Sequence, residues 1–342
     1  MPRSDNQVLE RAAAKTPYPI HMAVADYDRT RPLLDGRIKA AGVNLKAEAR
    51  YVGDFCVEPV YEQYDVAEMS FSWYVTARSQ GEPVVALPIF PLRMPVLAYV
   101  FVAKDSSISS VAELASKRIG VPSYRLTVNL WLRGIFNEHY GLAPSDVTWV
   151  TCEKNEGAGY EVPSDIKLEV ADGANAEKLL DQGKVDAILV PRLPQSFIER
   201  TSNMRRLFGD AQGEMHAYAR RVGFIPITHT IVMKQSLSEQ EPWLCESLTQ
   251  AFMDAQRVCD AAYQSDPKFV SMGDAIFHQE QNRAVYGANS WAHGVSANRP
   301  CIETFLRYAH EQGYTRRKLT IEELFPKNML GISTHDSGFR HF

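Results

Sequence analysis

Four apolar segments of this chain each run into a turn that carries groups suited to holding a small anion. The segments are residues 21–30, 64–74, 118–127 and 185–192. In open α/β sheets, ligands lie beyond the carboxyl ends of the strands, so we expect these turns to face one cleft. Their arginine and hydroxyl side chains predict a cleft for a small carboxylated molecule.

The first turn carries Asp28 and Arg29 at the start of an expected helix. The side-chain oxygen of Asp28 could cap this helix or contact a ligand, and both interpretations stay open. A cation in the first turn of a helix opposes the helix dipole, which makes a purely structural Arg29 unfavourable. We therefore expect Arg29 to bind a carboxylate through its guanidinium.

The second turn carries Ser70 and Ser72 directly after a buried strand. Serine hydroxyls cap helix starts, and helix starts also attract anions. One of the two serines is expected to cap the helix that follows, and the other is expected to contact the ligand.

The third turn combines Tyr124, Arg125 and Thr127, and the fourth carries Arg192. An arginine, a phenol and a helix start capped by Thr127 predict the strongest anion site of the sequence. A surface Arg125 beside a routine cap is the alternative. Arg192 is expected at the carboxyl edge of its sheet, where it could instead form a structural ion pair.

Two histidines are candidates for proton transfer. His229, with Thr228 beside it as a ligand contact, lies on a strand expected to connect two lobes at the base of the cleft. Histidine is the side chain best suited to moving protons near neutral pH, although a hydrogen-bonded core histidine is the alternative. His293, in the sequence WAHGVSAN, is the second candidate.

Composition and motifs exclude several classes of function. The formal net charge of −4 and the absence of a basic block argue against a nucleic-acid partner. No secretory h-region and no apolar stretch of about 20 residues is visible, so we expect no membrane association and a cytoplasmic location. The five cysteines form no CxxC pair, which predicts buried thiols and no metal site. Motifs of zincins, serine hydrolases, P-loop enzymes and dinucleotide-binding folds are also absent.

The order of strand and helix patterns predicts an α/β fold with a mainly parallel sheet. Strands near Val100 and Ile231 are expected to cross between two lobes, as in the type II periplasmic-binding-protein-like fold. Lobe 1 is then discontinuous and comprises residues 18–103 and 228–330, and lobe 2 comprises residues 104–227. The carboxyl-terminal part is expected to be mostly helical, with tails at 1–17 and 331–342.

The expected elements follow from these patterns. Strands are predicted at 21–25, 44–52, 65–69, 83–90, 95–104, 119–121, 146–151, 166–170, 185–190 and 225–234. Helices are predicted at 30–42, 57–64, 71–79, 127–141, 175–184, 211–221, 242–264, 267–286 and 299–312.

From Met22 to Phe325, the chain resembles the 4,5-dihydroxyphthalate decarboxylase family. The resemblance rests on YDRTRPLLDGRI, YDVAEMSFSWYVTARSQG, FPLRMP, RIGVPSYRLTVNLWLRGIF, VDAILVPRLP, RRLF, IPITHTIVMK and GVSANRPCIETFLRYAHEQG. The chain departs from the family pattern at His293, where an aromatic residue is expected, and in FPLRMPVLA, which has fewer arginines. These departures leave the substrate open.

The resemblance implies removal of one carboxylate from a hydroxylated aromatic acid, without a redox cofactor. A metal recruited from residues far apart in the sequence stays open. A general acid would protonate the ring carbon and carbon dioxide would leave. In this view Arg29, Arg125 and Arg192 anchor carboxylates, and His229 supplies the proton or polarises the phenol. Asp28 could accept a phenolic hydrogen bond, with help from Tyr124.

Two alternatives remain beside the decarboxylase. One is a non-catalytic solute-binding protein, and an amino-terminal export signal would favour it. The other is a synthase of the thiamin-pyrimidine precursor type, for which a Cys-rich or His-rich iron site is expected. The sequence leaves a homo-oligomer open.

Overall fold

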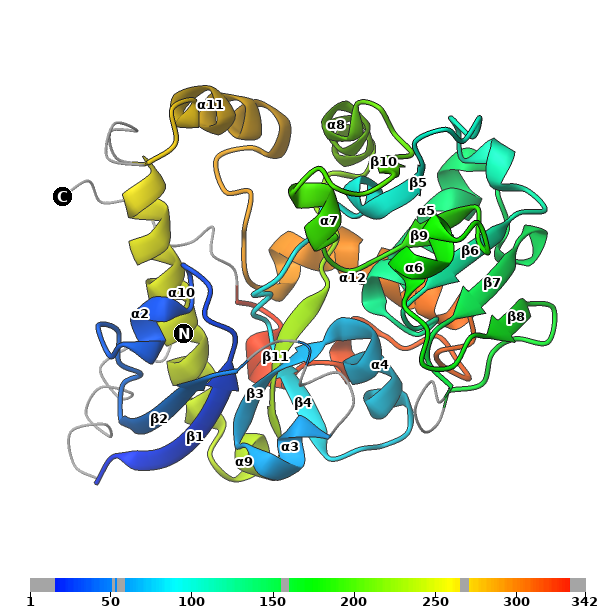
Figure 1. Cartoon of the computed structure of the whole chain (residues 1–342). Coiled ribbons are helices and arrows are strands. Elements are labelled where there is room, and N and C mark those ends of the chain that lie inside the picture. Colours follow the sequence, from blue (N-terminus) through cyan, green and yellow to red (C-terminus); the bar gives the residue numbers. More distant parts are fainter. Residues whose placement is uncertain (1–15, 51–52, 54–58, 155–159, 265–270, 333–342) are drawn as a thin grey trace. The chain divides into compact units, whose positions relative to one another are not determined.

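The computed structural model describes residues 16–50, 53, 59–154, 160–264 and 271–332. The chain divides into two compact units (Figure 1). Unit 1 comprises the segments Met1–Leu92, His229–Ile302 and Thr320–Phe342, and unit 2 comprises Arg93–Thr228 and Glu303–Leu319.

Unit 1 is built on a five-stranded sheet with the strand order β2-β1-β3-β11-β4. β1 pairs in parallel with β2 and β3, and β11 runs antiparallel to both β3 and β4. All residues of β3 and β4 are buried, as expected for strands covered on both faces. The strand bounds are Tyr18–Val24 for β1, Val43–Ala49 for β2, Val66–Ser70 for β3, Val84–Leu87 for β4 and His229–Lys234 for β11.

A long helix, α10, supplies much of the core of unit 1 (Figure 1). Its apolar residues Leu244, Leu248 and Phe252 recur every four residues, so one face of the helix packs against side chains of β1 and β11. The helices are α2 (Arg31–Leu34), α3 (Val60–Gln63), α4 (Phe71–Ser79), α9 (Gln235–Gln240), α10 (Pro242–Gln264), α11 (Ala275–Tyr286), the first part of α12 (Val295–Glu311), and the 3₁₀ turns η6 (Ile321–Glu323) and η7 (Lys327–Met329).

Unit 2 contains a six-stranded sheet with the order β10-β5-β9-β6-β7-β8. β9, β6, β7 and β8 are parallel, and β5 runs antiparallel to β9 and β10. Its strands are β5 (Val100–Ala103), β6 (Arg118–Val121), β7 (Thr148–Thr151), β8 (Lys167–Val170), β9 (Ala187–Leu189) and β10 (Met204–Arg206). Its helices are η2 (Val96–Tyr99), η3 (Ala112–Leu114), α5 (Thr127–Tyr140), η4 (Pro144–Asp146), α6 (Ala176–Asp181), α7 (Gln195–Ile198), α8 (Ala211–Val222) and the second part of α12.

The core of unit 2 is completed by the segment Glu303–Leu319. Within it, Gln312 and the Tyr314 hydroxyl accept hydrogen bonds of 2.8 and 2.9 Å from the buried guanidinium of Arg133 on α5. Phe305 lies 5.3 Å, centroid to centroid, from the ring of Trp131. The segment therefore belongs to unit 2 although it follows most of unit 1 in the sequence.

The two units differ from the expected lobes at the start of unit 2 and in the assignment of residues 303–319. Lobe 1 was expected to extend through residue 103, but β5 pairs with β9 and β10 and so lies in unit 2, which begins at Arg93. The segment Glu303–Leu319 was expected in lobe 1, and its contacts with α5 assign it to unit 2.

Most predicted elements are present, with shifted ends. The helix expected at 30–42 is only Arg31–Leu34, because the chain turns at Gly36 with a φ of 75°. The helix expected from Arg299 already begins at Val295. Of the helix expected at 267–286, the structure describes Ala275–Tyr286, and residues 267–270 lie outside the described ranges.

Candidate active site

The ends of β1 and β3 and the start of β11 meet at one edge of the sheet in unit 1. β1 and β3 are parallel, so their carboxyl ends share this edge. β11 is antiparallel to β3, and the strand register pairs its first residue, His229, with Ser70, the last residue of β3. Two of the four predicted turns and the predicted proton carrier are therefore brought together.

Glu68 on β3 is the central charged residue of this edge, and its side chain is completely buried. Oε1 accepts hydrogen bonds from Nδ1 of His229 at 2.7 Å and from the hydroxyl of Tyr27 at 2.8 Å. Oε2 accepts the backbone N–H of Ala25 at 3.0 Å. A buried carboxylate needs such donors, because an unpaired buried charge is strongly destabilising.

This arrangement defines the tautomer of His229. An ionised carboxylate can only accept, so Nδ1 of His229 carries the proton that it donates to Glu68. In the neutral ring, Nε2 then bears the lone pair, and among the described residues it has no hydrogen-bond partner. His229 is therefore held at one nitrogen and available for proton transfer at the other.

Arg29 lies between two aromatic rings in the same unit. Its guanidinium carbon is 4.2 Å from the ring centroid of Tyr27 and 4.5 Å from that of Trp291. Nε donates to the carbonyl of Pro91 at 2.5 Å, and Nη1 to Asp28 at 3.0 Å. Within the described part of the chain, Nη2 has no acceptor, so this nitrogen is available to an anion.

Asp28 is not the cap of α2, because the helix begins at Arg31 and Thr30 occupies the N-cap position. Burial raises the pKa of Asp28, but the Tyr263 hydroxyl, the Arg29 cation and the Cys259 thiol together bring that pKa below its ordinary value. Burial, with Asp28 nearby, raises the pKa of Cys259 to about 12, so this thiol stays protonated. Asp28 is thus a carboxylate that already accepts hydrogen bonds from nearby side chains of unit 1.

The two serines do not cap α4 as expected. Ser70 occupies the N-cap position, but its side chain makes no capping hydrogen bond to the described helix start. Ser72 lies inside the helix, where its carbonyl accepts the hydroxyl of Thr76. Both side chains are buried in unit 1, and a ligand contact for either remains a prediction.

His293 is buried and its tautomer is also defined. The backbone N–H of Phe90 donates to Nδ1 at 3.2 Å, so Nδ1 must be unprotonated and a neutral ring carries its proton on Nε2. The segment that holds His293 also holds the other groups of the site: Leu92 accepts the backbone N–H of His229, and Pro91 accepts Arg29. The residues between β4 and Leu92 therefore order the site of unit 1.

The predicted anion turn of unit 2 has a different structure from the one expected. Tyr124 is 1% exposed, and its ring lies 3.7 Å from the guanidinium carbon of Arg133 and 5.6 Å from the ring of Trp149. The carbonyl of Tyr124 accepts a hydrogen bond from Arg133. Tyr124 is therefore packed in an aromatic cluster, and a catalytic contribution from its phenol remains a prediction.

Thr127 is the first residue of α5 and not its cap. Leu126 occupies the N-cap position, and no side-chain capping bond is made within the described start of α5. Arg125 is buried, with its guanidinium carbon 5.9 Å from the ring of Tyr160. In the same unit, Arg192 follows β9 and is exposed. Thr228 is the last residue of the segment Arg93–Thr228 and is buried. Ligand contacts of Arg125, Thr127, Arg192 and Thr228 remain predictions.

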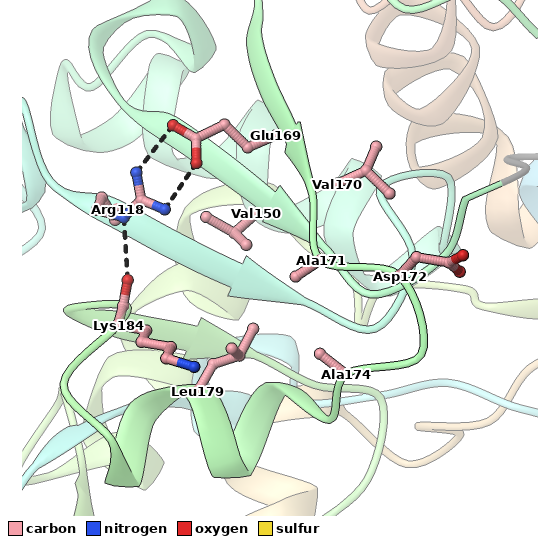
Figure 2. A pocket seen from close by; sticks show the side chains of 9 residues that line it. All are labelled: Arg118, Val150, Glu169, Val170, Ala171, Asp172, Ala174, Leu179 and Lys184. Atoms are coloured by element: carbon pink, nitrogen blue, oxygen red, sulfur yellow. Dashed lines mark hydrogen bonds and ion pairs between the residues drawn. The ribbon is translucent and has the colours of Figure 1, made fainter.

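A cavity of about 390 Å³ in unit 2 does not include any predicted site residue. Figure 2 shows it beside the bidentate ion pair of Arg118 and Glu169, with Arg118 also donating to the carbonyl of Lys184. The charges at this cavity are largely compensated by one another. It therefore carries no chemistry comparable to the site of unit 1.

Further predictions from the sequence concern metal ligands, cysteines and membrane spans. No group of three or more His, Cys, Asp and Glu residues that could hold a metal is present among them. Cys245, Cys259 and Cys301 are buried thiols and Cys152 is half-buried, whereas Cys56 lies outside the described ranges. None of the described helices is long and apolar enough to span a membrane.

No family model matches the chain. The chain is 32% identical over 325 residues to a 4,5-dihydroxyphthalate decarboxylase of Comamonas testosteroni, with 90% of this chain and 96% of that protein covered. The chain belongs to the 4,5-dihydroxyphthalate decarboxylase family. A Pseudomonas putida protein of the same name is 32% identical over 213 residues, which cover 60% of this chain and 83% of that protein.

Solved structures similar to this member of the 4,5-dihydroxyphthalate decarboxylase family define its fold. The periplasmic aliphatic sulphonate binding protein SsuA of Escherichia coli has a TM-score of 0.55 at 14% identity, with 91% of this chain and 92% of that chain covered. The sulfonate-binding protein SsuA of Methylobacillus flagellatus KT has a TM-score of 0.57 at 14% identity, with 93% and 94% covered. The predicted periplasmic-binding-protein-like α/β fold is confirmed.

Proposed function

We propose that the protein is a decarboxylase that removes one carboxylate from a hydroxylated aromatic acid such as 4,5-dihydroxyphthalate. The observation that carries this proposal is the buried Glu68–His229 pair, which leaves Nε2 of His229 able to carry a proton, while Tyr27 bonds the same Glu68 and packs its ring against Arg29. The names of the two relatives support it. The cytoplasmic location expected from the sequence is part of the proposal.

The reaction needs a carboxylate anchor and a proton donor. Arg29 binds a carboxylate of the substrate, and protonated His229 gives its Nε2 proton to the ring carbon that bears the departing carboxylate. The bond from that carbon to the carboxylate breaks, its electron pair returns to the ring, and carbon dioxide leaves. A phenolic hydroxyl para to the carbon supplies electron density, and His229 recovers its proton from solvent.

The experiment is a panel of hydroxylated aromatic acids incubated with the purified protein, with carbon dioxide release followed in the presence and absence of a chelator. Release from at least one acid that carries a hydroxyl para to a carboxylate is the expected result. Tight binding of these acids without release from any of them would overturn the proposal.

His229→Gln should lower kcat by about 10²–10⁴-fold, because general acid catalysis contributes about that factor. The dissociation constant of the substrate should change little, since Arg29 is intact. Calorimetric binding and initial-rate kinetics on the same preparation separate these two effects. Near-normal turnover by the variant would exclude His229 as the proton donor.

A solute-binding protein is the second candidate, because the two structural neighbours named above are sulphonate-binding proteins by name. This function predicts binding of a carboxylated ligand with no chemical change. The same panel distinguishes it, since the ligand would be recovered intact after prolonged incubation.

A further inference from the structure

We propose that Tyr27 and Glu68 are positioning residues of this site, with Tyr27 connecting the proton-carrying His229 to the anion-binding Arg29. The inference rests on the proposed function, since it assigns residues to that reaction. It arises from contacts between three segments that are far apart in the sequence: the turn after β1, strand β3 and the start of β11.

Glu68 acts on the imidazole of His229. Its 2.7 Å hydrogen bond fixes the proton of the neutral ring on Nδ1 and directs Nε2 away from β3. The negative charge also stabilises the imidazolium form that the reaction requires. The carboxylate is in turn oriented by the N–H of Ala25 on its second oxygen, so it cannot rotate without losing a bond.

Tyr27 contacts both halves of the site with different parts of one side chain. Its hydroxyl donates a hydrogen bond to Oε1 of Glu68, the same oxygen that accepts the Nδ1 proton of His229. Because this oxygen serves two donors, its electrostatic attraction for the His229 ring is weaker than it would be with one. The face of the Tyr27 ring lies 4.2 Å from the guanidinium carbon of Arg29. The hydroxyl therefore tunes the proton carrier, and the ring orients the anion anchor.

Trp291 provides a comparison within the same site. Its ring covers Arg29 at 4.5 Å from the guanidinium carbon, as the ring of Tyr27 does, and its indole N–H donates to the carbonyl of Phe90. Within the described residues, its indole N–H bonds neither Glu68 nor His229. A change at Trp291 should therefore disturb the anchor without disturbing the proton carrier.

The groups that surround His229 come from several segments. Glu68 lies on β3 and Tyr27 follows β1, while Arg29 and His293 are both bonded to the segment between β4 and Leu92. Of these, Glu68 is hydrogen-bonded to the imidazole, at 2.7 Å. The pH dependence of turnover should therefore respond most strongly to Glu68.

The experiment measures kcat, KM and the pH profile of turnover for wild type and four variants on the acid that the panel identifies. Glu68→Gln replaces the carboxylate that accepts the Nδ1 proton by a neutral amide and should move the alkaline limb of the kcat profile to lower pH. Tyr27→Phe keeps the ring and removes the competing donor, so this limb should move slightly to higher pH at unchanged KM.

The remaining two variants test the anchor. Tyr27→Leu should repeat the shift of Tyr27→Phe and also raise KM by about two- to fivefold, because a cation–π contact of Arg29 is lost. Trp291→Leu should raise KM by a similar factor and leave the alkaline limb where it is in wild type. Thermal melts of all variants show whether each is folded.

Two outcomes would overturn the proposal: an unmoved alkaline limb in Glu68→Gln, or the same profile in Tyr27→Phe and Trp291→Leu. A wild-type protein that releases no carbon dioxide contradicts the proposed function instead. In that case, the titration of the His229 imidazole is followed by ¹⁵N NMR in the resting protein, with His229→Gln for assignment. An identical titration in Glu68→Gln then overturns the positioning role without reference to activity.

Discussion

A guanidinium held between two aromatic rings loses little conformational freedom when it binds an anion, because its orientation is already fixed. Arg29 is held in this way, and its side chain is only 14% exposed. Arg31, two residues later, is 56% exposed and paired with Asp26 at the surface. The two arginines form a matched pair for testing which one is functional.

Arg29→Met should weaken binding of the aromatic acid by at least about tenfold, because a charge-assisted hydrogen bond contributes roughly 1.5–3 kcal/mol. Arg31→Met is the control and should leave affinity within about twofold, since exposed ion pairs contribute little. Isothermal titration of both variants checks this prediction. Equal losses in the two variants would contradict a specific anchor at Arg29.

Asp28 should make unfolding dependent on pH. The Tyr263 hydroxyl and the Arg29 cation outweigh burial, so the pKa of Asp28 is lower in the folded than in the unfolded protein. Its stabilising contribution is therefore present above the unfolded pKa and is lost as pH falls through the folded pKa. Because the side chain is 43% exposed, the contribution should be below about 1 kcal/mol.

Asp28→Asn should accordingly lower the free energy of unfolding at neutral pH. The difference from wild type should shrink as pH falls from about 5 to about 3. Urea unfolding at several pH values measures it. A difference that grows toward acid pH would mean that the carboxyl is destabilising when ionised.

At the scale of single residues, the sequence predicts Arg29 and His229 as site residues but does not predict the side chains that they contact. Arg29 and His229 stand out because their residue types suit anion binding and proton transfer. Glu68 was not predicted, although it is the one carboxylate in the buried strand Val66–Ser70 and this was an available signal. Its partner His229 is 161 residues away, and no local pattern encodes such a contact.

Helix α5 depends on a close approach that only glycine permits. A Cβ at Gly134 would lie 2.2 Å from the ring of Tyr308, which is 1% exposed and whose hydroxyl bonds to Glu138. The ring has no space into which to move, because Trp131 lies against it at 5.7 Å between centroids. This contact joins α5 to the late segment Glu303–Leu319.

Gly134→Ala should lower the free energy of unfolding by more than about 1 kcal/mol, since overpacking a core commonly costs about 1–3 kcal/mol. Alanine has the higher helix propensity, so stabilisation would be expected if space were available. Gly209→Ala is the control, because no atom lies within 4 Å of its added Cβ. Chemical denaturation of both variants tests the prediction, and equal stability would contradict it.

Elements were predicted best where capping and periodicity agree. Gly141 ends α5, the helix predicted at 127–141, with a φ of 69°. The predicted cap at Thr127 was wrong, because the helix starts at that residue. The sheet to which a strand belongs is decided by long-range pairing, and the sequence of β5 carries no sign of it.

The separation of unit 2 into two chain segments leads to a prediction for the whole molecule. A fragment of residues 93–228 should not fold to a stable state, because Arg133 and Trp131 on α5 lose Gln312, Tyr314 and Phe305. Leaving a buried cation without its partners costs about 3–5 kcal/mol, which is much of the stability of a small domain.

The test adds the missing segment by a flexible linker. The fragment of residues 93–228 joined to residues 303–319 should show a cooperative thermal transition and a dispersed NMR spectrum, and the unextended fragment should show neither. A linker of the same length without residues 303–319 is the control. A cooperative transition in the unextended fragment would contradict the assignment of the late segment to unit 2.

The four passages of the chain between the two units also constrain folding during synthesis. Proteins commonly fold domain by domain as they leave the ribosome, with the amino-terminal domain first. Here unit 1 obtains Leu324 and Met329, and unit 2 obtains Tyr314, only after the segments that precede them in both units have emerged. Neither unit can complete its core before then, so both stay dependent on protection from aggregation until these segments have left the ribosome.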